Sequence, residues 1–363
     1  MKKMLMGATA LAMVGGASYA GGIDRSGQGV NILFEEGNFA QITFVTVNPN
    51  VDAVPGGPIS ATPSAFDVAQ NYADFSLGYK HEVNDKLDLA IIYDNPFGAH
   101  VDYGTTGGFL DGGLADVETN ALTALAQYQL GNGFSVHGGL RLMEVDGIIN
   151  NALGELDISS DFDLGGVVGV AYEKPEIALR VALTYNSSIS ADLSGTRAER
   201  DGSNPQARTA TVDFPESINL DFQTGVAPNT LVFGSVRYVP FEGVNLTTVD
   251  GQWVNFQDDI TTYNLGIARR INDKLSLAVR FGFEDEGTKP TNTALSPSTG
   301  SKSITLAGTY QLSEHLSLSG GVTYAKLGDQ FLNLPSPPLP AGSRYDYRDS
   351  DAIGVGLRIG IQF

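Results

Sequence analysis

The sequence predicts an all-β protein: a 14-stranded antiparallel transmembrane β-barrel with a short N-terminal hatch inside its lumen. Three observations predict this fold class. Apolar and polar residues alternate with period two over most of the chain, and no apolar run beyond residue 20 is long enough to cross a bilayer as a helix. Short and long connections also follow one another in regular alternation along the chain.

The end of the chain shows the alternation most clearly. In residues 351–363, DAIGVGLRIGIQF, every odd position from Ile353 to Phe363 is apolar, whereas the even positions carry glycine, Arg358 or Gln362. Period two gives a strand with two unlike faces. A chain built almost wholly of such strands satisfies both faces by closing into a barrel, with its apolar faces toward lipid and its small polar faces toward a lumen.

The same alternation predicts fourteen strands in order along the chain. They cover residues 39–48, 70–82, 86–97, 116–130, 133–147, 158–173, 176–190, 210–226, 230–243, 258–271, 274–284, 301–312, 315–327 and 348–363, which together make up a barrel domain over 39–363.

The connections between these strands give an independent test. Tight turns are predicted at residues 84–85, 131–133, 174–175, 227–229, 272–273 and 313–314, and long polar connections such as 192–209 and 328–347 fall between them. Bacterial outer-membrane barrels have short periplasmic turns and long external loops. The alternation therefore predicts the outer membrane of a Gram-negative bacterium.

The first twenty residues are typical of a secretory signal peptide. Lys2 and Lys3 precede an apolar segment, and small residues stand at the cleavage positions Ser18 and Ala20. Removing residues 1–20 takes two lysines and no acid from a chain of net charge -19, so the mature protein becomes more acidic still. Such a charge argues against a nucleic-acid partner. The absence of cysteine excludes disulfides and thiolate metal sites.

Residues 21–38 precede the first strand and lack its alternation. Their apolar side chains, spaced by glycines, suit a hatch that folds into the barrel mouth, and the alternative is a disordered lead-in to the first strand. The residues assigned to the hatch are Ile23, Val30, Leu33, Phe34 and Asn38.

The third strand ends in an unusual way, at Asn95, Pro96, Phe97 and Gly98. Proline removes a donor from the ladder and glycine removes a side chain, so pairing is expected to fail and the strand to bend. A gap in the wall at this kink would be a lateral gate into lipid. The alternative is that the strand has simply ended.

The inward faces carry five arginines that suit an anionic head group, because a guanidinium donates two parallel hydrogen bonds to a carboxylate. These candidate ligand-binding residues are Arg141, Arg180, Arg237, Arg280 and Arg358. The alternative is that they form internal salt bridges with lumenal acids such as Asp88, Asp163 and Asp221.

We predict no catalytic residue, metal site or cofactor. The histidines, His81, His100, His137 and His315, are scattered without the i, i+4 spacing of a metal site, and no serine lies in a recognisable nucleophile motif.

Several of these residues resemble the FadL/TodX group of outer-membrane transporters over essentially the whole mature chain. The resemblance rests on Ser26-Gly27, Glu36-Gly37-Asn38, the Asn-Pro-Phe-Gly break followed by residues 100–103 (HVDY), residues 214–217 (FPES) and the terminal Phe363. It implies a barrel plugged by an N-terminal hatch, with a kinked third strand as a lateral opening. The hatch here is shorter than in fatty-acid importers of the group and lacks an Asn-Pro-Ala motif.

By this resemblance we expect a monomeric passive transporter of hydrophobic molecules, long-chain fatty acids or similar lipophilic compounds, which leave sideways into outer-membrane lipid. Two other classes fit the strand pattern. A general diffusion porin would have an open lumen and conduct ions, and a structural or adhesive barrel would have a sealed lumen and functional loops.

Overall fold

The computed structural model describes residues 23–105 and 107–363. The predicted signal peptide, residues 1–20, lies outside the described residues. Among the residues described, no helix is long and apolar enough to cross a membrane.

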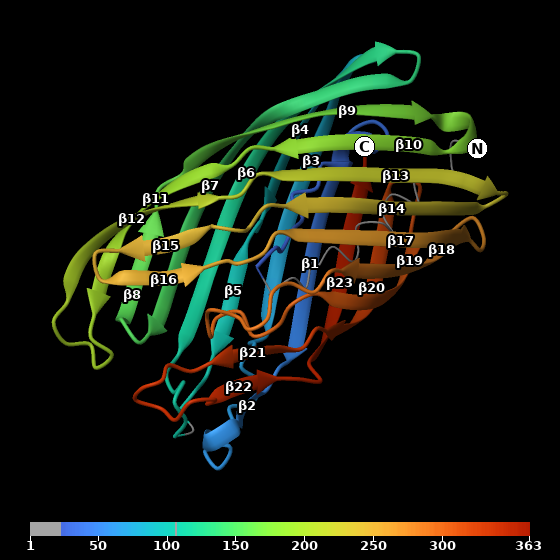
Figure 1. The fold of residues 1–363 in the computed structure, drawn as a ribbon. Coiled ribbons are helices and arrows are strands. Elements are labelled where there is room, and N and C mark those ends of the chain that lie inside the picture. Colours follow the sequence, from blue (N-terminus) through green and yellow to red (C-terminus); the bar gives the residue numbers. More distant parts are fainter. Residues whose placement is uncertain (1–22, 106) are drawn as a thin grey trace.

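The described residues form a closed antiparallel barrel, which confirms the predicted fold class. The sheet has eighteen strand segments at fourteen positions, because four positions each hold two successive segments. The barrel closes because β1 pairs along one edge with β23 and along the other with β3. Figure 1 shows the long strands side by side around this wall.

The fourteen positions, in order, are β1 (Phe39–Asn50), β3 (Tyr72–Asn84), β4 (Leu87–Asp94) with β5 (Gly98–Asp102), β6 (Leu114–Gly131), β7 (Phe134–Asn151), β8 (Gly154–Ser160) with β9 (Asp163–Lys174), β10 (Leu179–Asn186) with β11 (Ile189–Ala198), β12 (Gln206–Phe214) with β13 (Ser217–Ala227), β14 (Thr230–Val239), β17 (Ile260–Arg270), β18 (Leu275–Glu284), β19 (Ser301–Gln311), β20 (Leu316–Leu327) and β23 (Asp351–Gln362).

The two faces of the wall are as the alternation predicts. On β23, Ile353 and Leu357 are 51% and 52% exposed, whereas Ala352 and Arg358 are 1% and 2% exposed. A water-soluble sheet would bury the aliphatic face instead. The exposed face is therefore the surface that lipid would cover.

Four predicted strands need correction, because each is interrupted. Residues 158–173, 176–190 and 210–226 are divided between β8 and β9, β10 and β11, and β12 and β13. The third strand, predicted over 86–97, ends at Asp94 and resumes at Gly98. Proline explains two of the breaks, at Pro96 and Pro215, because it cannot donate to a ladder.

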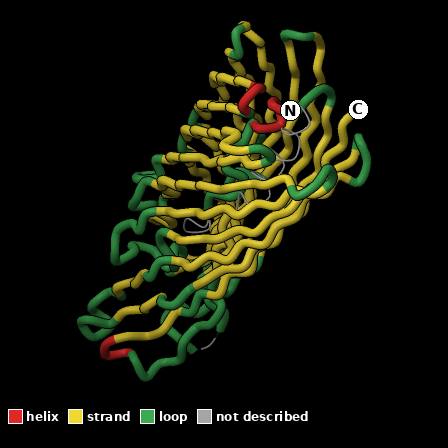
Figure 2. Tube along the Cα trace, turned by 90° about the vertical axis from the view of Figure 1, so that its right-hand side faces the viewer, coloured by secondary structure: helices red, strands yellow, loops and turns green. Residues whose placement is uncertain are grey.

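The long connections gather at one end of the barrel, which we call the loop end, and the short turns lie at the other, the turn end (Figures 1 and 2). Two small sheets in these connections were not predicted. One contains β2 (Ala53–Gly56), β22 (Arg344–Tyr347) and β21 (Gln330–Asn333), and the other is the hairpin of β15 (Asn245–Thr248) and β16 (Gly251–Asn255). The described residues also form the 3₁₀ helices η2 (Asn31–Phe34), η3 (Gly57–Ile59) and η4 (Pro175–Ile177).

The barrel interior contains packed side chains. Residues 23–38, the N-terminal segment, lie inside, and Val30, Ile32, Leu33 and Phe34 form one cluster with inward-facing residues of the wall. A larger cluster joins inward-facing strand residues to side chains of the loop-end connections.

Candidate functional site

The wall is irregular at its third position. β4 ends with Asp94 opposite Ala121 of β6, and β5 begins with Gly98 opposite Glu118. Three residues of the third position therefore face two residues of β6, which is a bulge. Pro96 lies in the middle of it and has no N–H to donate.

The neighbouring strand loses its partner at this bulge. The ladder between β3 and β4 ends at the pair Leu77 and Tyr93. Beyond this pair, residues 72–76 of β3 still pair with β1. In the part of the chain described, they pair with neither β4 nor β5. The Asn95 side chain bridges the two neighbouring strands: its Nδ2 donates to Asn120 Oδ1 of β6 at 2.9 Å, and its Oδ1 accepts from Phe75 N of β3 at 3.5 Å. The sheet thus has an interrupted ladder between β3 and β5.

The start of the N-terminal segment occupies this interruption. Gly98 N donates to Ile23 O at 2.9 Å, and Arg25 N donates to Pro96 O at 2.9 Å. These two hydrogen bonds flank an antiparallel bridge between Asp24 and Phe97. Residues 23–25 therefore act as a short added strand. They satisfy backbone groups that the bulge would otherwise leave without partners.

A buried ion pair fixes this added strand to the opposite wall. Asp24 is fully buried, and its carboxylate accepts from Arg237 Nε at 2.6 Å and Nη2 at 3.0 Å. Arg237 Nη1 also donates to Ser217 Oγ and Asn219 Oδ1, at 2.9 and 2.8 Å. A paired guanidinium with its other donors satisfied is the arrangement in which a buried charge is tolerated.

A second ion pair fixes the other end of the N-terminal segment. Arg358 Nη2 donates to Glu35 Oε1 at 2.8 Å, and Lys80 Nζ donates to the Glu35 carbonyl at 2.6 Å. Asn38 Oδ1, at the end of the segment, accepts from the backbone N–H of Glu82 at 2.9 Å.

Apolar packing fills the space between these anchors. Val30, Leu33 and Phe34, predicted for the hatch, are 3%, 1% and 9% exposed. Ile32 points into a notch at Gly78 of β3, where an added Cβ would approach Ile32 Cδ1 to 2.6 Å. The wall residues packed around them are Phe39, Ala90, Ile92, Leu125, Val167, Ala171 and Ala182.

The other three predicted arginines are buried in the same lumen. Arg141 donates to Thr123 and Asn186, each at 2.9 Å, Arg180 lies 4.6 Å above the Phe34 ring, and Arg280 donates to Thr305 at 3.3 Å. Of the five arginines, Arg180, Arg237 and Arg358 contact the N-terminal segment. Two of the five form internal salt bridges, which is the alternative given above, but the acids belong to the N-terminal segment: Arg237 pairs with Asp24 and Arg358 with Glu35.

Aromatic side chains pack against the kink from inside. Phe97 is 2% exposed, and its ring lies 5.5 Å from that of Phe214 and 5.8 Å from that of Phe241. Phe241 in turn packs against Phe256 at 5.5 Å. These four packed rings connect the loop-end connection over residues 240–259 with the interrupted wall.

A groove lies among the loop-end connections. It encloses about 500 Å³, within the range of small-molecule sites. Its apolar side chains come from five separate connections, and they include Phe109, Leu110, Leu153, Trp253, Leu295, Leu332 and Leu334. Trp253, Leu295 and Leu332 also belong to the interior cluster that contains Phe97 and Phe241.

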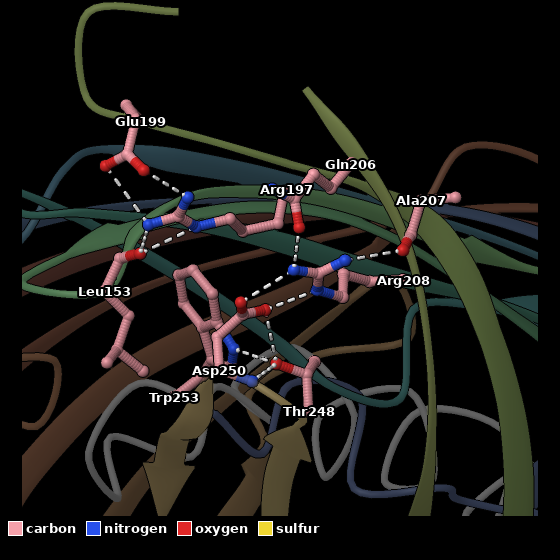
Figure 3. Close-up of polar contacts among 9 residues, drawn as sticks. All are labelled: Leu153, Arg197, Glu199, Gln206, Ala207, Arg208, Thr248, Asp250 and Trp253. Carbon is pink, nitrogen blue, oxygen red and sulfur yellow. Dashed lines mark hydrogen bonds and ion pairs between the residues drawn. The ribbon is translucent and has the colours of Figure 1, made fainter. Parts of the chain in front are cut away.

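Figure 3 shows the polar contacts around Trp253, which is one of the groove residues. Arg208 of β12 binds Asp250 through Nε at 2.5 Å and Nη2 at 2.8 Å, and so joins the barrel wall to the β15–β16 hairpin. Within the hairpin, Trp253 Nε1 donates to Thr248 Oγ1 at 2.9 Å. Arg197 of β11 donates twice to the carbonyl of Leu153, another groove residue.

The electrostatics of this connection favour the ionised form of Asp250. Hydrogen bonds from the Arg208 guanidinium, supported by Thr248, lower the pKa of Asp250 to about 2. The hairpin is thus held by a charge pair that persists well into acidic solution.

The structure brings one group of titratable residues together that the sequence analysis did not predict. His100 Nδ1 lies 2.6 Å from Asp116 Oδ1, and His100 Nε2 lies 3.6 Å from Glu118 Oε1. The cross-strand pairs between β5 and β6 place these side chains on one face beside the bulge.

Sequence reasoning also missed the groove and the anchoring acids. The groove residues lie on connections that have no periodic pattern, and only Trp253, the single tryptophan of the chain, carried a compositional signal. Asp24 and Glu35 stand in the N-terminal segment among glycines and polar residues, where nothing local identifies an ion-pair partner.

A closed antiparallel barrel with an aliphatic outer face is the architecture of an outer-membrane β-barrel. A family model described as "Outer membrane protein transport protein (OMPP1/FadL/TodX)" matches residues 6–363. The chain belongs to this family of outer-membrane transport proteins.

Solved structures show the same fold at low sequence identity. A Pseudomonas aeruginosa FadL homologue is 14% identical with a TM-score of 0.77, over 99% of this chain and 98% of that chain. The Pseudomonas putida toluene transporter TodX is 14% identical with a TM-score of 0.66, over 99% of both chains. The CymD monoaromatic hydrocarbon channel is 14% identical with a TM-score of 0.61, over 97% of this chain and 98% of that chain. No curated protein matches the chain.

Proposed function

We propose that this protein is a passive transporter of hydrophobic small molecules in the Gram-negative outer membrane, and that it releases them sideways through the interrupted third strand. The ligand first binds the loop-end groove, moves along the Phe256, Phe241 and Phe97 rings, and leaves between β3 and β5. The observation that carries this proposal is the bulge at Asn95–Gly98. There the third position does not pair with β3, and a short stretch of the N-terminal segment forms backbone hydrogen bonds with it.

Energetics favour a lateral exit. A hydrophobic molecule that crossed into the periplasm would expose its apolar surface to water, at a cost of roughly 0.8 kcal/mol per methylene group. A passage that ends at the lipid-facing wall avoids this cost. The movement then needs no energy source beyond the concentration gradient.

The N-terminal segment acts as a hatch in this proposal. Residues 23–25 close the gap, and the ion pairs of Arg237 and Arg358 hold them there. We therefore assign these two arginines to the hatch rather than to the ligand. Ligand binding by Arg141, Arg180 and Arg280 stays a prediction.

Two of the similar structures bear on the ligand. TodX is described as a toluene transporter and CymD as a monoaromatic hydrocarbon channel. The aromatic rings along the passage suit compounds of that kind. We propose uncharged aromatic or aliphatic compounds, and long-chain fatty acids remain a second class to test.

The test is to repair the ladder. Deleting Pro96 and replacing Asn95 and Phe97 with threonine and valine removes the extra residue, so that the third position can pair continuously. We expect toluene uptake into cells or vesicles to fall to the background of a strain without the protein. Heat-modifiable migration on a gel checks that the barrel still folds.

The matched control removes a proline from another strand. Pro49 of β1 lies opposite Ala352 of β23, and Pro49→Thr leaves the third position unchanged. Its uptake should equal that of the wild type. Normal uptake by the repaired variant would refute the lateral exit.

A further inference from the structure

The interruption in the wall between β3 and β5 is bounded at both ends. On the turn side it begins after the pair of Leu77 and Tyr93. On the loop side it ends at an isolated antiparallel bridge between Ala69 and Val101. Between these pairs, in the part of the chain described, residues 71–76 form no ladder with the third position. We call this opening the window.

The backbone of the N-terminal segment reaches one edge of the window. Its hydrogen bonds with Pro96 and Gly98 run along the third position. Among the described residues, no backbone hydrogen bond joins residues 23–25 to residues 71–76 on the opposite edge. Closure of the window by the segment therefore depends on a side chain.

The Arg25 side chain spans the window from edge to edge. Its Nε donates to the carbonyl of Gly98 at 3.1 Å. Its guanidinium carbon lies 3.3 Å from the centroid of the Tyr72 ring, and Nη1 lies 3.9 Å from Asp74 Oδ1. A guanidinium over a ring face makes a favourable cation–π contact. One side chain thus contacts β5 on one side and β3 on the other.

The wall gives this guanidinium its space. Arg25 is 4% exposed, so it is enclosed by protein. A Cβ added at Gly98 would lie 3.1 Å from the carbonyl oxygen of Val117 and 3.4 Å from Arg25 Nε. Gly98, the last residue of the predicted break, therefore allows the guanidinium to approach the backbone of β5 closely.

Arg25 can leave the window without the rest of the segment. Successive residues of an extended stretch point in opposite directions. Asp24 accordingly points to Arg237 across the lumen, whereas Arg25 points to the window. Asp24 is held by two charged hydrogen bonds at 2.6 and 3.0 Å, but Asp74 lies 3.9 Å from Arg25. A rotation of the Arg25 side chain can therefore open the window while the anchor at Asp24 stays in place.

We infer that Arg25 is the gate residue of the lateral exit: its guanidinium, placed between Gly98 and the Tyr72 ring, closes the window, and the ligand passes when the guanidinium leaves the ring. This inference rests on the proposed lateral release and adds the residue that regulates it. Passage requires no movement of residues 26–38, so the lumen stays filled and closed to ions while the ligand leaves.

The test measures toluene uptake and ion conductance of the full-length protein in the same variants. Arg25→Ala removes the side chain that spans the window, and we expect toluene uptake several-fold faster than in the wild type. Conductance in planar bilayers should stay at the wild-type level, because Asp24 and Glu35 still anchor the segment. Arg25→Lys keeps a cation near the ring and should return uptake close to the wild-type rate.

A second variant removes the partner of the gate residue. Tyr72→Leu takes away the ring face, so uptake should rise as in Arg25→Ala. The double variant should show no further increase, because both substitutions break the same contact. Tyr310→Leu is the matched control and should take up toluene like the wild type. Tyr310 is an exposed tyrosine of β19, which β20, β23 and β1 separate from β3.

Three results would overturn the inference. The first is uptake by folded Arg25→Ala at or below the wild-type rate, and the second is a rise that Arg25→Lys does not reverse. The third is faster uptake together with the conductance of a barrel that lacks its N-terminal segment, since the whole segment would then have left. If gel mobility shows that Arg25→Ala does not fold, uptake and conductance of Tyr72→Leu decide by the same criteria.

The outcome also separates this inference from the proposed function. If the variant with the repaired third strand takes up toluene normally, the lateral exit itself fails, and Arg25 has no exit to close. If the repair stops uptake but Arg25→Ala and Tyr72→Leu behave like the wild type, only the gate role of Arg25 fails.

Discussion

Arg237 illustrates how much depends on single residues in this lumen. Its guanidinium joins Asp24 of the N-terminal segment to Ser217 and Asn219 of β13. Both charged residues are buried, so the strength of the contact comes from complete pairing in a place that water does not reach.

We predict that Arg237→Leu releases the start of the N-terminal segment. Removing one partner of a buried ion pair costs about 3–5 kcal/mol, because the remaining charge stays buried without compensation. Trypsin provides the measurement, since its cleavage site after Arg25 is 4% exposed in the wild type. Mass spectrometry should detect rapid cleavage after Arg25 in the variant only.

Arg269→Leu serves as the control for this experiment. Arg269 is exposed near the turn end, away from the N-terminal segment, so cleavage should stay as slow as in the wild type. Protection of Arg25 in folded Arg237→Leu would contradict the anchoring role.

At the scale of elements, the β15–β16 hairpin carries Trp253 to the groove and is tied to β12 by Arg208 and Asp250. The pKa of Asp250 lies below its ordinary value of 3.8, at about 2, because Arg208 donates to the ionised form. A lowered folded-state pKa means that the ion pair contributes its full stability above about pH 4. The contribution is lost as the pH falls through about 2.

This linkage predicts an acid transition that tryptophan fluorescence can follow, because Trp253 is the only tryptophan. We expect a constant signal from pH 7 to about pH 4 and a change as the pH approaches about 2. In Asp250→Asn the tie is already weakened, so the signal should differ at neutral pH and show no acid step. Asp349→Asn, on another connection, should keep the wild-type titration, and an unchanged step in Asp250→Asn would disprove the assignment.

At the scale of the whole molecule, the N-terminal segment decides whether the barrel is a filled passage or an open pore. Its removal takes away the apolar cluster around Ile32 and Phe34 and both ion pairs to the wall. We predict that deleting residues 23–38 produces ion conductance in planar bilayers that is several-fold above the wild type. Toluene uptake should also become independent of the repaired third strand.

The control deletion removes residues 335–341 at an exposed loop tip and should leave conductance unchanged. A wild-type protein that already conducts as strongly as the deletion variant would favour the diffusion porin instead. A barrel that neither conducts nor takes up toluene, with or without the segment, would favour the structural class.

The sequence by itself determined the wall of this protein. Period-two alternation predicted the fourteen positions and the outward aliphatic face, and Asn95–Gly98 predicted where pairing fails. These features are local. Successive strand residues point to opposite faces of the sheet, and proline lacks a backbone N–H donor in any strand. The break at Pro215 divides the strand predicted over 210–226 into β12 and β13, but both segments lie at the predicted position in the wall.

Only the tertiary structure decided what fills and surrounds that wall. Arg237 and Arg358 bind Asp24 and Glu35 rather than Asp88, Asp163 or Asp221, and Trp253 meets Leu295 and Leu332 from distant connections. No local pattern encodes these partners, because they come together only when the barrel closes and fixes which side chains share the lumen.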